Sequence, residues 1–240
     1  MSKPLVVITG ASSGIGAETA KLFSAAGYPL LLLARRLPPM KKLKLPNCIV
    51  EKADVCDVKM VTAAIKKAEK KYGKVGCLIN NAGVMINSVS WKGDSRDWQK
   101  MVDVNIVGLM NGVRAVLPDM VKRQNGSIIN IGSIAGRKTF GNHALYCGTK
   151  FAVHAMTETI REEVSGSNVR VMCVAPGMVA TDLINGTRDK GVRDGWLAYA
   201  KDIGGALKPE SIAQTILWAY QMPQSVCVRE VVVCPTKQEP

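Results

Sequence analysis

Short apolar runs alternate with amphipathic stretches along most of this chain. Residues 5–8 and 30–34 are apolar at every position, and residues 128–131 are interrupted only by Asn130. Consecutive apolar positions are typical of strands that are buried on both faces of a parallel sheet. Between these runs, apolar residues recur at the spacing of one helix face, which predicts amphipathic helices.

The predicted strands cover residues 5–8, 30–34, 48–51, 75–79, 127–131, 169–174 and about 226–233. The predicted helices cover about residues 17–23, 58–71, 97–123, 146–164 and 209–220. This alternation predicts an α/β fold, a Rossmann-like doubly wound parallel sheet of about seven strands flanked by helices. With no internal repeat and no linker, the chain is expected to form a single domain over residues 1–240.

The alternation lapses in two places. Residues 178–207 are rich in Gly, Asp, Lys and Thr and include Trp196 and Tyr199. A stretch this long between regular elements is usually a lid or binding loop, so we predict a substrate-binding loop here. A shorter stretch, in which Lys41, Lys42 and Lys44 follow two prolines, is predicted to be a charged surface loop.

A Gly-rich turn follows the first strand, with the sequence TGASSGIG at residues 9–16. Glycines let the backbone turn sharply and approach a ligand, and the N-terminus of the next helix offers N–H groups to a phosphate. The spacing Gly-x-x-x-Gly-x-Gly differs from the Gly-x-Gly-x-x-Gly of the commonest dinucleotide fingerprint. A tight turn without a ligand is the alternative interpretation.

The second predicted strand ends in Arg35 and Arg36. In a βαβ dinucleotide site, an acidic residue at this point holds the ribose 2′-hydroxyl of NAD, whereas arginine suits the 2′-phosphate of NADP. No carboxylate occurs between Glu18 and Glu51. The pattern favours NADP(H) over NAD(H) as the cofactor; the alternative is that both arginines are surface charges.

Tyr146 and Lys150 are four residues apart in a predicted helix, which places them on one helix face. A lysine ammonium favours phenolate, so we predict that the Tyr146 hydroxyl titrates nearer to neutrality than its usual pKa of about 10. Such a hydroxyl can exchange a proton with a substrate oxygen. Ser133 follows a predicted strand, at the edge where parallel sheets bind ligands. A Tyr-x-x-x-Lys spacing alone also occurs by chance on helix surfaces.

Composition excludes several classes of protein. Seven scattered cysteines and two histidines, His143 and His154, show no metal-ligand spacing, so we predict reduced thiols and no metal. The net charge is +13, but aromatic residues are only 5% and do not interleave with the basic runs, which argues against nucleic acid as a partner. The longest apolar runs are too short to span a membrane and no secretory pattern is present, so we expect a cytoplasmic protein.

Together these motifs resemble the short-chain dehydrogenase/reductase family, in its shorter, single-domain branch, over about residues 4–235. Residues 9–16 are similar to its cofactor turn, and Asn80-Asn81-Ala82-Gly83 to a motif that stabilises its central sheet. The residues that match its catalytic tetrad are Asn105, Ser133, Tyr146 and Lys150. The residues that the resemblance assigns to the cofactor are Gly10, Ser12, Ser13, Gly14, Ile15, Gly16, Arg35, Arg36, Asp54, Val55, Asn81, Ala82, Gly83, Tyr146, Lys150, Pro176, Gly177, Val179 and Thr181.

The resemblance implies hydride transfer between a nicotinamide and a carbonyl or alcohol, such as an aldehyde, a ketone, a secondary alcohol or a small hydroxy acid. Tyr146 would be the general acid in reduction and the base in oxidation, with Lys150 lowering its pKa and holding the nicotinamide ribose. Ser133 would bind the substrate carbonyl, and Asn105 would hold a water that links Lys150 to solvent. The predicted substrate contacts are Ser133, His143, Tyr146, Met178 and Trp196.

The family also implies a homo-oligomer, a tetramer or a dimer. Two other functions stay open from the sequence. One is an NADP-binding sensor or regulator without catalysis. The other is a nucleic-acid binder that would account for the positive charge, which salt-sensitive binding without competition from NADPH would reveal.

Overall fold

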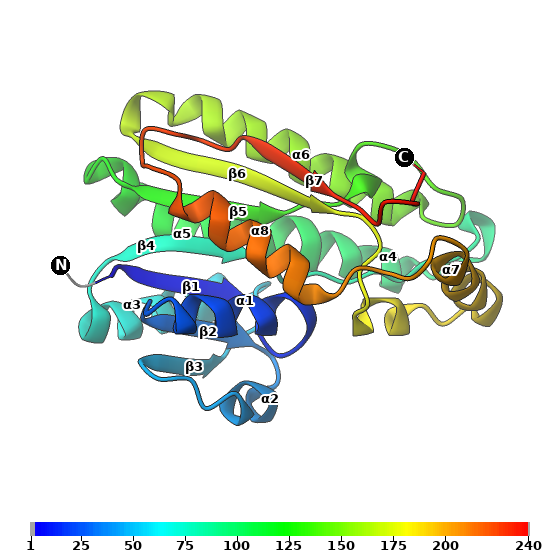
Figure 1. The fold of residues 1–240 in the computed structure, drawn as a ribbon, viewed down its shortest axis with the longest axis horizontal. Coiled ribbons are helices and arrows are strands. Elements are labelled where there is room, and N and C mark those ends of the chain that lie inside the picture. Colours follow the sequence, from blue (N-terminus) through cyan, green and yellow to red (C-terminus); the bar gives the residue numbers. More distant parts are fainter. Residues whose placement is uncertain (1–2, 240) are drawn as a thin grey trace.

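Seven parallel strands form one sheet in the order β3-β2-β1-β4-β5-β6-β7 (Figure 1). The computed structural model describes residues 3–239. The strands are β1 (Leu5–Thr9), β2 (Leu30–Ala34), β3 (Cys48–Lys52), β4 (Val75–Asn80), β5 (Gly126–Ile131), β6 (Val169–Pro176) and β7 (Glu230–Val233). The order reverses between β1 and β4, which confirms the predicted doubly wound sheet.

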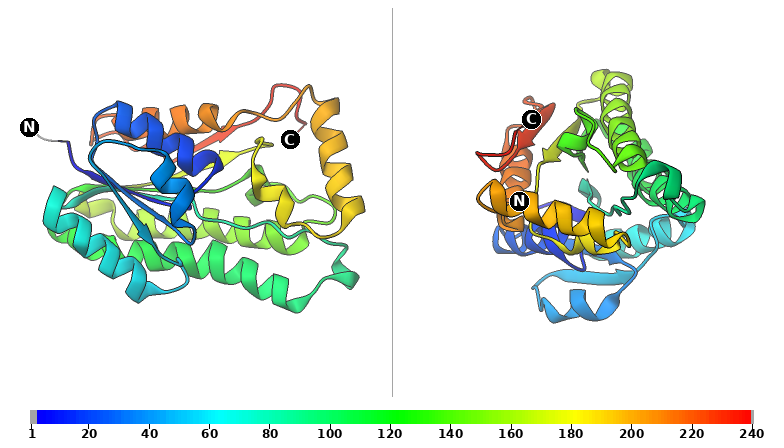
Figure 2. Two further views of the ribbon diagram at one scale, coloured as in Figure 1. Left: turned by 90° about the horizontal axis from the view of Figure 1, so that it is seen from below. Right: turned by 90° about the vertical axis from the view of Figure 1, so that its right-hand side faces the viewer.

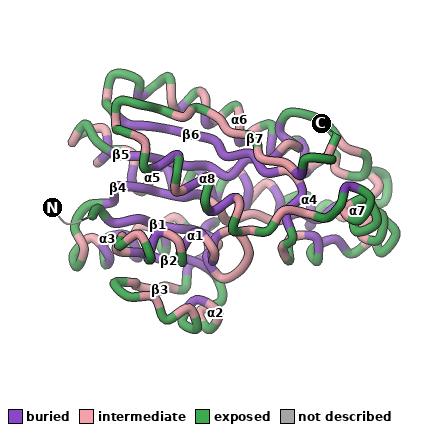
Figure 3. Tube along the Cα trace, in the orientation of Figure 1, coloured by how far each residue is buried: buried purple, intermediate pink, exposed green. Residues whose placement is uncertain are grey.

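Helices cover both faces of the sheet (Figure 2). The helices are α1 (Gly14–Ala25), α2 (Leu37–Lys42), α3 (Val58–Tyr72), α4 (Ser95–Val102), α5 (Gly108–Lys122), α6 (Ala144–Glu163), α7 (Lys190–Asp202) and α8 (Pro209–Gln221). One apolar core lies between the sheet and α3, α5 and α6, and a second lies between the sheet and α1 and α8. The central strands are buried along their whole length (Figure 3), as continuous apolar runs require.

The helix ends follow local chemistry. Asp57 caps α3 by accepting hydrogen bonds from the backbone N–H groups of Lys59 at 2.8 Å and Met60 at 3.1 Å. Gly73 ends the same helix with a φ of 82°, a conformation that a side chain would strain. The apolar side of α3 packs on the sheet while the lysines along it face outward, so the basic run is a solvated helix face.

The predicted loop after Pro38–Pro39 is wrong, because residues 37–42 form the helix α2. Both prolines lie in its first turn, where a backbone N–H has no partner within the helix, so they start this helix instead of preventing it. Lys44 lies beyond the helix with a φ of 51°.

Three further predictions, of a helix, a loop and a strand, need correction. The single helix predicted over residues 97–123 is interrupted by a π-helical turn, Asp103–Val107, between α4 and α5. The loop predicted over residues 178–207 contains a 3₁₀ turn, Asp182–Gly186, and the helix α7. The last strand begins at Glu230 instead of near residue 226. Over the part of the chain that the structure describes, no helix is both long and apolar enough to cross a bilayer.

Candidate active site and cofactor cleft

A cavity of about 1220 Å³ opens at the carboxyl ends of the strands. It is larger than the roughly 300–1,000 Å³ of ordinary small-molecule pockets. Its walls come from the Gly-rich turn, the ends of β2, β4, β5 and β6, the start of α6, and α7. Of the residues assigned to the site from the sequence, all except Gly16 and Asn105 line this cavity.

The Gly-rich turn is fixed against the end of β4. The Asn81 side chain donates to the carbonyls of Thr9 at 2.9 Å and Gly10 at 3.3 Å, and the Thr9 hydroxyl accepts from the backbone N–H groups of Asn81 and Ala82. Gly10 has a φ of 66°, and a Cβ there would lie 2.8 Å from Ala82 Cα. Only glycine allows both this conformation and this close approach.

The N-terminus of α1 faces the cavity without a cap. Ser13, its N-cap residue, makes no side-chain hydrogen bond to the helix, and the first turn carries no acidic residue. Unpaired N–H groups and the positive end of the helix dipole make such a terminus suited to a phosphate. Gly16, in the first turn of α1, has no room for a side chain, since a Cβ would lie 2.5 Å from Asn81 Nδ2 and 2.6 Å from Gly10 O.

Positive charge lies beside this terminus. Arg35 and Arg36 are exposed at the end of β2 and line the cavity. Arg36 reaches within 3.5 Å of the Ser12 hydroxyl, across the mouth of the Gly-rich turn. Asp54 and Val55 form the adjoining wall. A pyrophosphate with a further phosphate fits this donor set, because the groups supplied are backbone N–H groups, hydroxyls and two guanidinium groups.

Three polar side chains are buried together at the centre of the cavity. Tyr146 and Lys150 lie on one face of α6 and are each 7% exposed, and Ser133, just after β5, is 8% exposed. The Lys150 ammonium donates a hydrogen bond of 2.8 Å to Ile131 O and lies 5.8 Å from the centre of the Tyr146 ring. The sequence prediction that these residues meet at a strand end therefore agrees with the geometry.

The predicted pKa of Tyr146 is wrong in direction for this structure. Burial raises the pKa of the Tyr146 phenol to about 12, and a hydrogen bond with the Ser133 side chain offsets only part of that rise. Burial also lowers the pKa of Lys150, to about 8. The phenol is neutral at pH 7, because removal from water disfavours a phenolate more than the hydrogen bond with Ser133 favours it.

Asn105 lies in the π-helical turn, and its amide is engaged by protein groups. Its Oδ1 accepts from Val84 N at 2.8 Å, and its Nδ2 donates to Val84 O at 2.9 Å and to Thr149 Oγ1 at 3.1 Å. The side chain thus joins the loop after β4 to α6, one residue before Lys150. Its predicted role in holding a water stays a prediction.

The predicted substrate residues His143, Met178 and Trp196 line the same cavity. Burial lowers the pKa of His143. Residues that the sequence did not indicate line the same cavity: Lys100, Lys138, Phe140, Arg188, Gln238 and Glu239. Lys100 lies on α4, the others come from loops and from the C-terminal tail, and no local motif marks them. Gln238 accepts a hydrogen bond of 2.9 Å from Met178 N, so the tail is tied to the loop after β6.

The sequence pattern of the short chain dehydrogenase family matches residues 4–191. The chain belongs to this family. The match confirms the resemblance drawn from the motifs and covers β1 through the start of α7, including the Gly-rich turn and Tyr146.

Relatives of this short chain dehydrogenase include an uncharacterized oxidoreductase of Staphylococcus saprophyticus. The two sequences are 41% identical over an alignment of 240 positions, which covers 98% of this chain and 96% of that protein. The closed form of serine dehydrogenase complexed with NADP⁺ superposes with a TM-score of 0.91 at 29% identity, over 98% of this chain and 96% of that one. An alcohol dehydrogenase from the archaeon Thermococcus sibiricus, complexed with 5-hydroxy-NADP, gives a TM-score of 0.86 at 25% identity over 99% of both chains.

Proposed function

We propose that this protein is an NADP(H)-dependent oxidoreductase that transfers a hydride between the nicotinamide and a carbonyl or alcohol substrate. The observation that carries the proposal is the burial of Ser133, Tyr146 and Lys150 together in a cavity that extends to the Gly-rich turn and Arg35. The solved structures of relatives that are complexed with NADP⁺ or an NADP derivative support the choice of cofactor.

The chain's own residues hold and orient the reactants in this proposal. The start of α1 would hold the pyrophosphate, and the guanidinium groups of Arg35 and Arg36 would hold the 2′-phosphate. The Lys150 ammonium would hold a hydroxyl of the nicotinamide ribose. The cofactor supplies the hydride.

Proton transfer is the task of Tyr146. At pH 7 the buried phenol carries its proton, because its pKa is raised to about 12. In carbonyl reduction the phenol donates this proton to the substrate oxygen, while the Ser133 hydroxyl donates a hydrogen bond to the same oxygen as negative charge develops there. Closure of the site by residues 178–207 would exclude water.

The substrate class follows from this chemistry: aldehydes, ketones, secondary alcohols or small hydroxy acids. We also infer that residues 1–240 act as one domain, in which residues 178–207 close the substrate side. A homo-oligomer is the expected assembly.

The test is NADPH oxidation with a panel of aldehydes, ketones and keto acids. Tyr146→Phe should lower kcat about 100-fold or more, because general acid catalysis contributes roughly 10²–10⁴. NADPH binding, measured by fluorescence, should be unchanged. Tyr72→Phe is the matched control, since Tyr72 lies on α3 in the apolar core, and it should keep full activity.

Two outcomes would contradict the proposal. Full turnover by Tyr146→Phe would remove the phenol from the mechanism. Tight NADPH binding with no turnover over the whole panel would favour a cofactor-binding sensor instead.

A further inference from the structure

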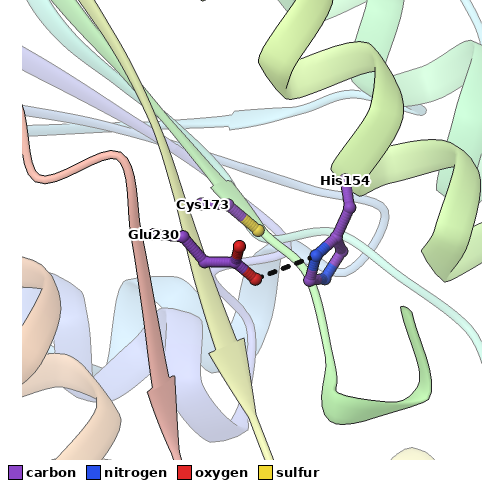
Figure 4. A group of neighbouring side chains, drawn as sticks. All are labelled: His154, Cys173 and Glu230. Carbon is purple, nitrogen blue, oxygen red and sulfur yellow. Dashed lines mark ion pairs between the residues drawn. The ribbon is translucent and has the colours of Figure 1, made fainter. Parts of the chain in front are cut away.

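His154 continues the stripe of polar residues on α6 that begins with Tyr146 and Lys150. The three are spaced four residues apart, so each follows the last along one side of the helix. The His154 side chain is 13% exposed. Figure 4 shows it reaching toward Cys173 of β6 and Glu230 of β7. It is not among the described residues that line the large cavity.

Both ring nitrogens of His154 have partners. Nε2 lies 3.3 Å from the backbone N of Ser133, and Nδ1 lies 3.0 Å from Glu230 Oε1. A backbone N–H can only donate, so Nε2 must be the unprotonated nitrogen. Nδ1 then carries the ring proton and donates it to Glu230, which also accepts from Arg137 Nε at 2.6 Å.

The backbone around Ser133 is shaped to this ring. A Cβ on Gly132 would lie 2.5 Å from His154 Nε2, and a Cβ on Gly136 would lie 2.5 Å from His154 Cδ2. The imidazole therefore fills the space that glycines leave on both sides of Ser133. One helical turn earlier, Lys150 donates to Ile131 O, so two side chains of α6 hold the same short segment.

We propose that His154 is a positioning residue whose neutral imidazole, oriented by Glu230, fixes the Ser133 backbone so that the Ser133 hydroxyl faces Tyr146. This inference rests on the proposed oxidoreductase function. Protonation of Nε2 would place two donors against each other, ring N–H against backbone N–H. Ser133 would then lose its backbone contact with His154, and its hydroxyl would no longer be held in position for the substrate carbonyl.

The charges around His154 set where this protonation occurs. Glu230 from β7 favours the protonated ring, whereas Lys150 on α6 and Arg137 after β5 disfavour it. Burial is the largest effect, and the pKa of His154 is lowered below its usual value. The neutral imidazole is thus the form present at pH 7, and its loss is expected only in acid.

His154, Cys173 and Glu230 are close enough together to bind a metal ion, since their ligand atoms lie within 4.8 Å of one another. Three features disfavour a cation. Glu230 is already paired with Arg137, both histidine nitrogens are hydrogen-bonded, and burial raises the pKa of the Cys173 thiol to about 12. A metal would have to displace the contact to Ser133 or the contact to Glu230.

The first experiment uses the wild-type chain and needs no activity. A ¹⁵N NMR spectrum of the histidine side chains at pH 7 should show His154 protonated at Nδ1 and unprotonated at Nε2. Protonation at Nε2 would overturn the proposal. Equimolar Zn²⁺ should leave the His154 signals unchanged, and a shift that Cys173→Ala abolishes would assign the cluster to a metal instead.

The second experiment compares His154→Leu with His154→Gln. Leucine removes the acceptor and should lower kcat by about tenfold, the equivalent of one lost hydrogen bond, with NADPH binding unchanged. Glutamine can offer an oxygen to the Ser133 N–H and a donor to Glu230, so it should keep kcat within about threefold. Glutamine does not titrate, so this variant should lack the decline of kcat in acid that we expect of the wild type. Cys173→Ala, the control in the same cluster, should match the wild type.

The results separate the two proposals. Wild-type kcat in His154→Leu, or an unchanged acid decline in His154→Gln, would overturn the role of His154. If the wild-type protein turns over no substrate, the proposed function fails, and the NMR tautomer still decides whether His154 anchors Ser133. If His154→Leu does not fold, His154→Gln and the tautomer carry the test.

Discussion

Replacing Lys150 by methionine measures what a buried ammonium costs this fold. Lys150 is 7% exposed, and burial lowers its pKa from 10.5 to about 8. Each pKa unit corresponds to about 1.4 kcal/mol, so holding the charged form inside the folded protein costs about 3 kcal/mol. Methionine fills a similar volume and carries no charge.

The sign of the effect depends on pH. The folded protein binds this proton with a pKa of about 8, and the unfolded chain binds it near 10.5. Below pH 8 both states are protonated and the folded state bears the whole cost. Between pH 8 and 10.5 the unfolded state holds more protons, so the Lys150 contribution to wild-type stability improves as pH rises. Above pH 10.5 the cost is gone.

The variant also loses a contact. Lys150 donates to Ile131 O at 2.8 Å, and methionine leaves this buried carbonyl without that donor, at a cost of about 1–3 kcal/mol. At pH 7 the two effects nearly balance, so Lys150→Met should range from equal to the wild type to about 2 kcal/mol more stable. At pH 10 it should range from equal to the wild type to about 2 kcal/mol less stable, because most of the charge cost has left the wild type while the lost contact remains.

Urea unfolding of the cofactor-free protein, followed by circular dichroism under reducing conditions, gives both free energies. Thiols and tyrosines titrate in both proteins, so their effects cancel in the difference between variant and wild type. Lys70→Met, on the exposed side of α3, is the control for replacing a lysine by methionine. A Lys150→Met difference that is the same at pH 7 and pH 10 would refute the reasoning.

Two further predictions concern the cofactor end of the cleft. Arg35→Asp should weaken NADPH binding at least about tenfold more than NADH binding, because it removes a phosphate partner and adds repulsion. The control Lys41→Asp, on exposed α2, should not change the preference between the two cofactors. Equal losses of affinity for NADPH and NADH in titrations of Arg35→Asp would contradict the assignment. Gly16→Ala should lower the free energy of unfolding by about 1–3 kcal/mol, since its Cβ would lie 2.6 Å from Gly10 O. Gly148→Ala, with open space around its Cβ on α6, should instead raise it by about 0.5–1 kcal/mol in the same denaturation assay.

The inner strands were predictable because each is buried on both faces, whereas the edge strands β3 and β7 are only partly buried. The run Leu30–Ala34 was predicted to the residue, since five consecutive apolar positions are typical of a strand that is buried on both faces of a parallel sheet. The helix α8 was predicted nearly as well, because Pro209 marks its first turn. A pair of prolines is a poorer guide at α2, because Pro38 and Pro39 are compatible with a loop and also with the first turn of a helix, which they occupy here.

Local motifs reveal a site only where the chain brings its residues together in short range or at strand ends. Tyr146 and Lys150 share one helix face, and Ser133 ends a strand, so their meeting followed from periodicity and sheet geometry. His154 and Glu230 lie 76 positions apart on elements joined only through the folded sheet. No spacing in the sequence indicates that they meet behind Ser133.

The pKa of Tyr146 shows why charge alone is a poor guide to a buried group. The Lys150 ammonium lies 5.8 Å from the centre of the Tyr146 ring, and a positive charge beside a phenol favours the phenolate. The sequence reveals this charge, but the burial that opposes its effect exists only in the folded protein, and burial is the largest effect on the pKa of Tyr146. A phenol that keeps its proton at pH 7 is ready to act as an acid. Carbonyl reduction is therefore the direction in which Tyr146 needs no prior ionisation, whereas alcohol oxidation must first remove its proton.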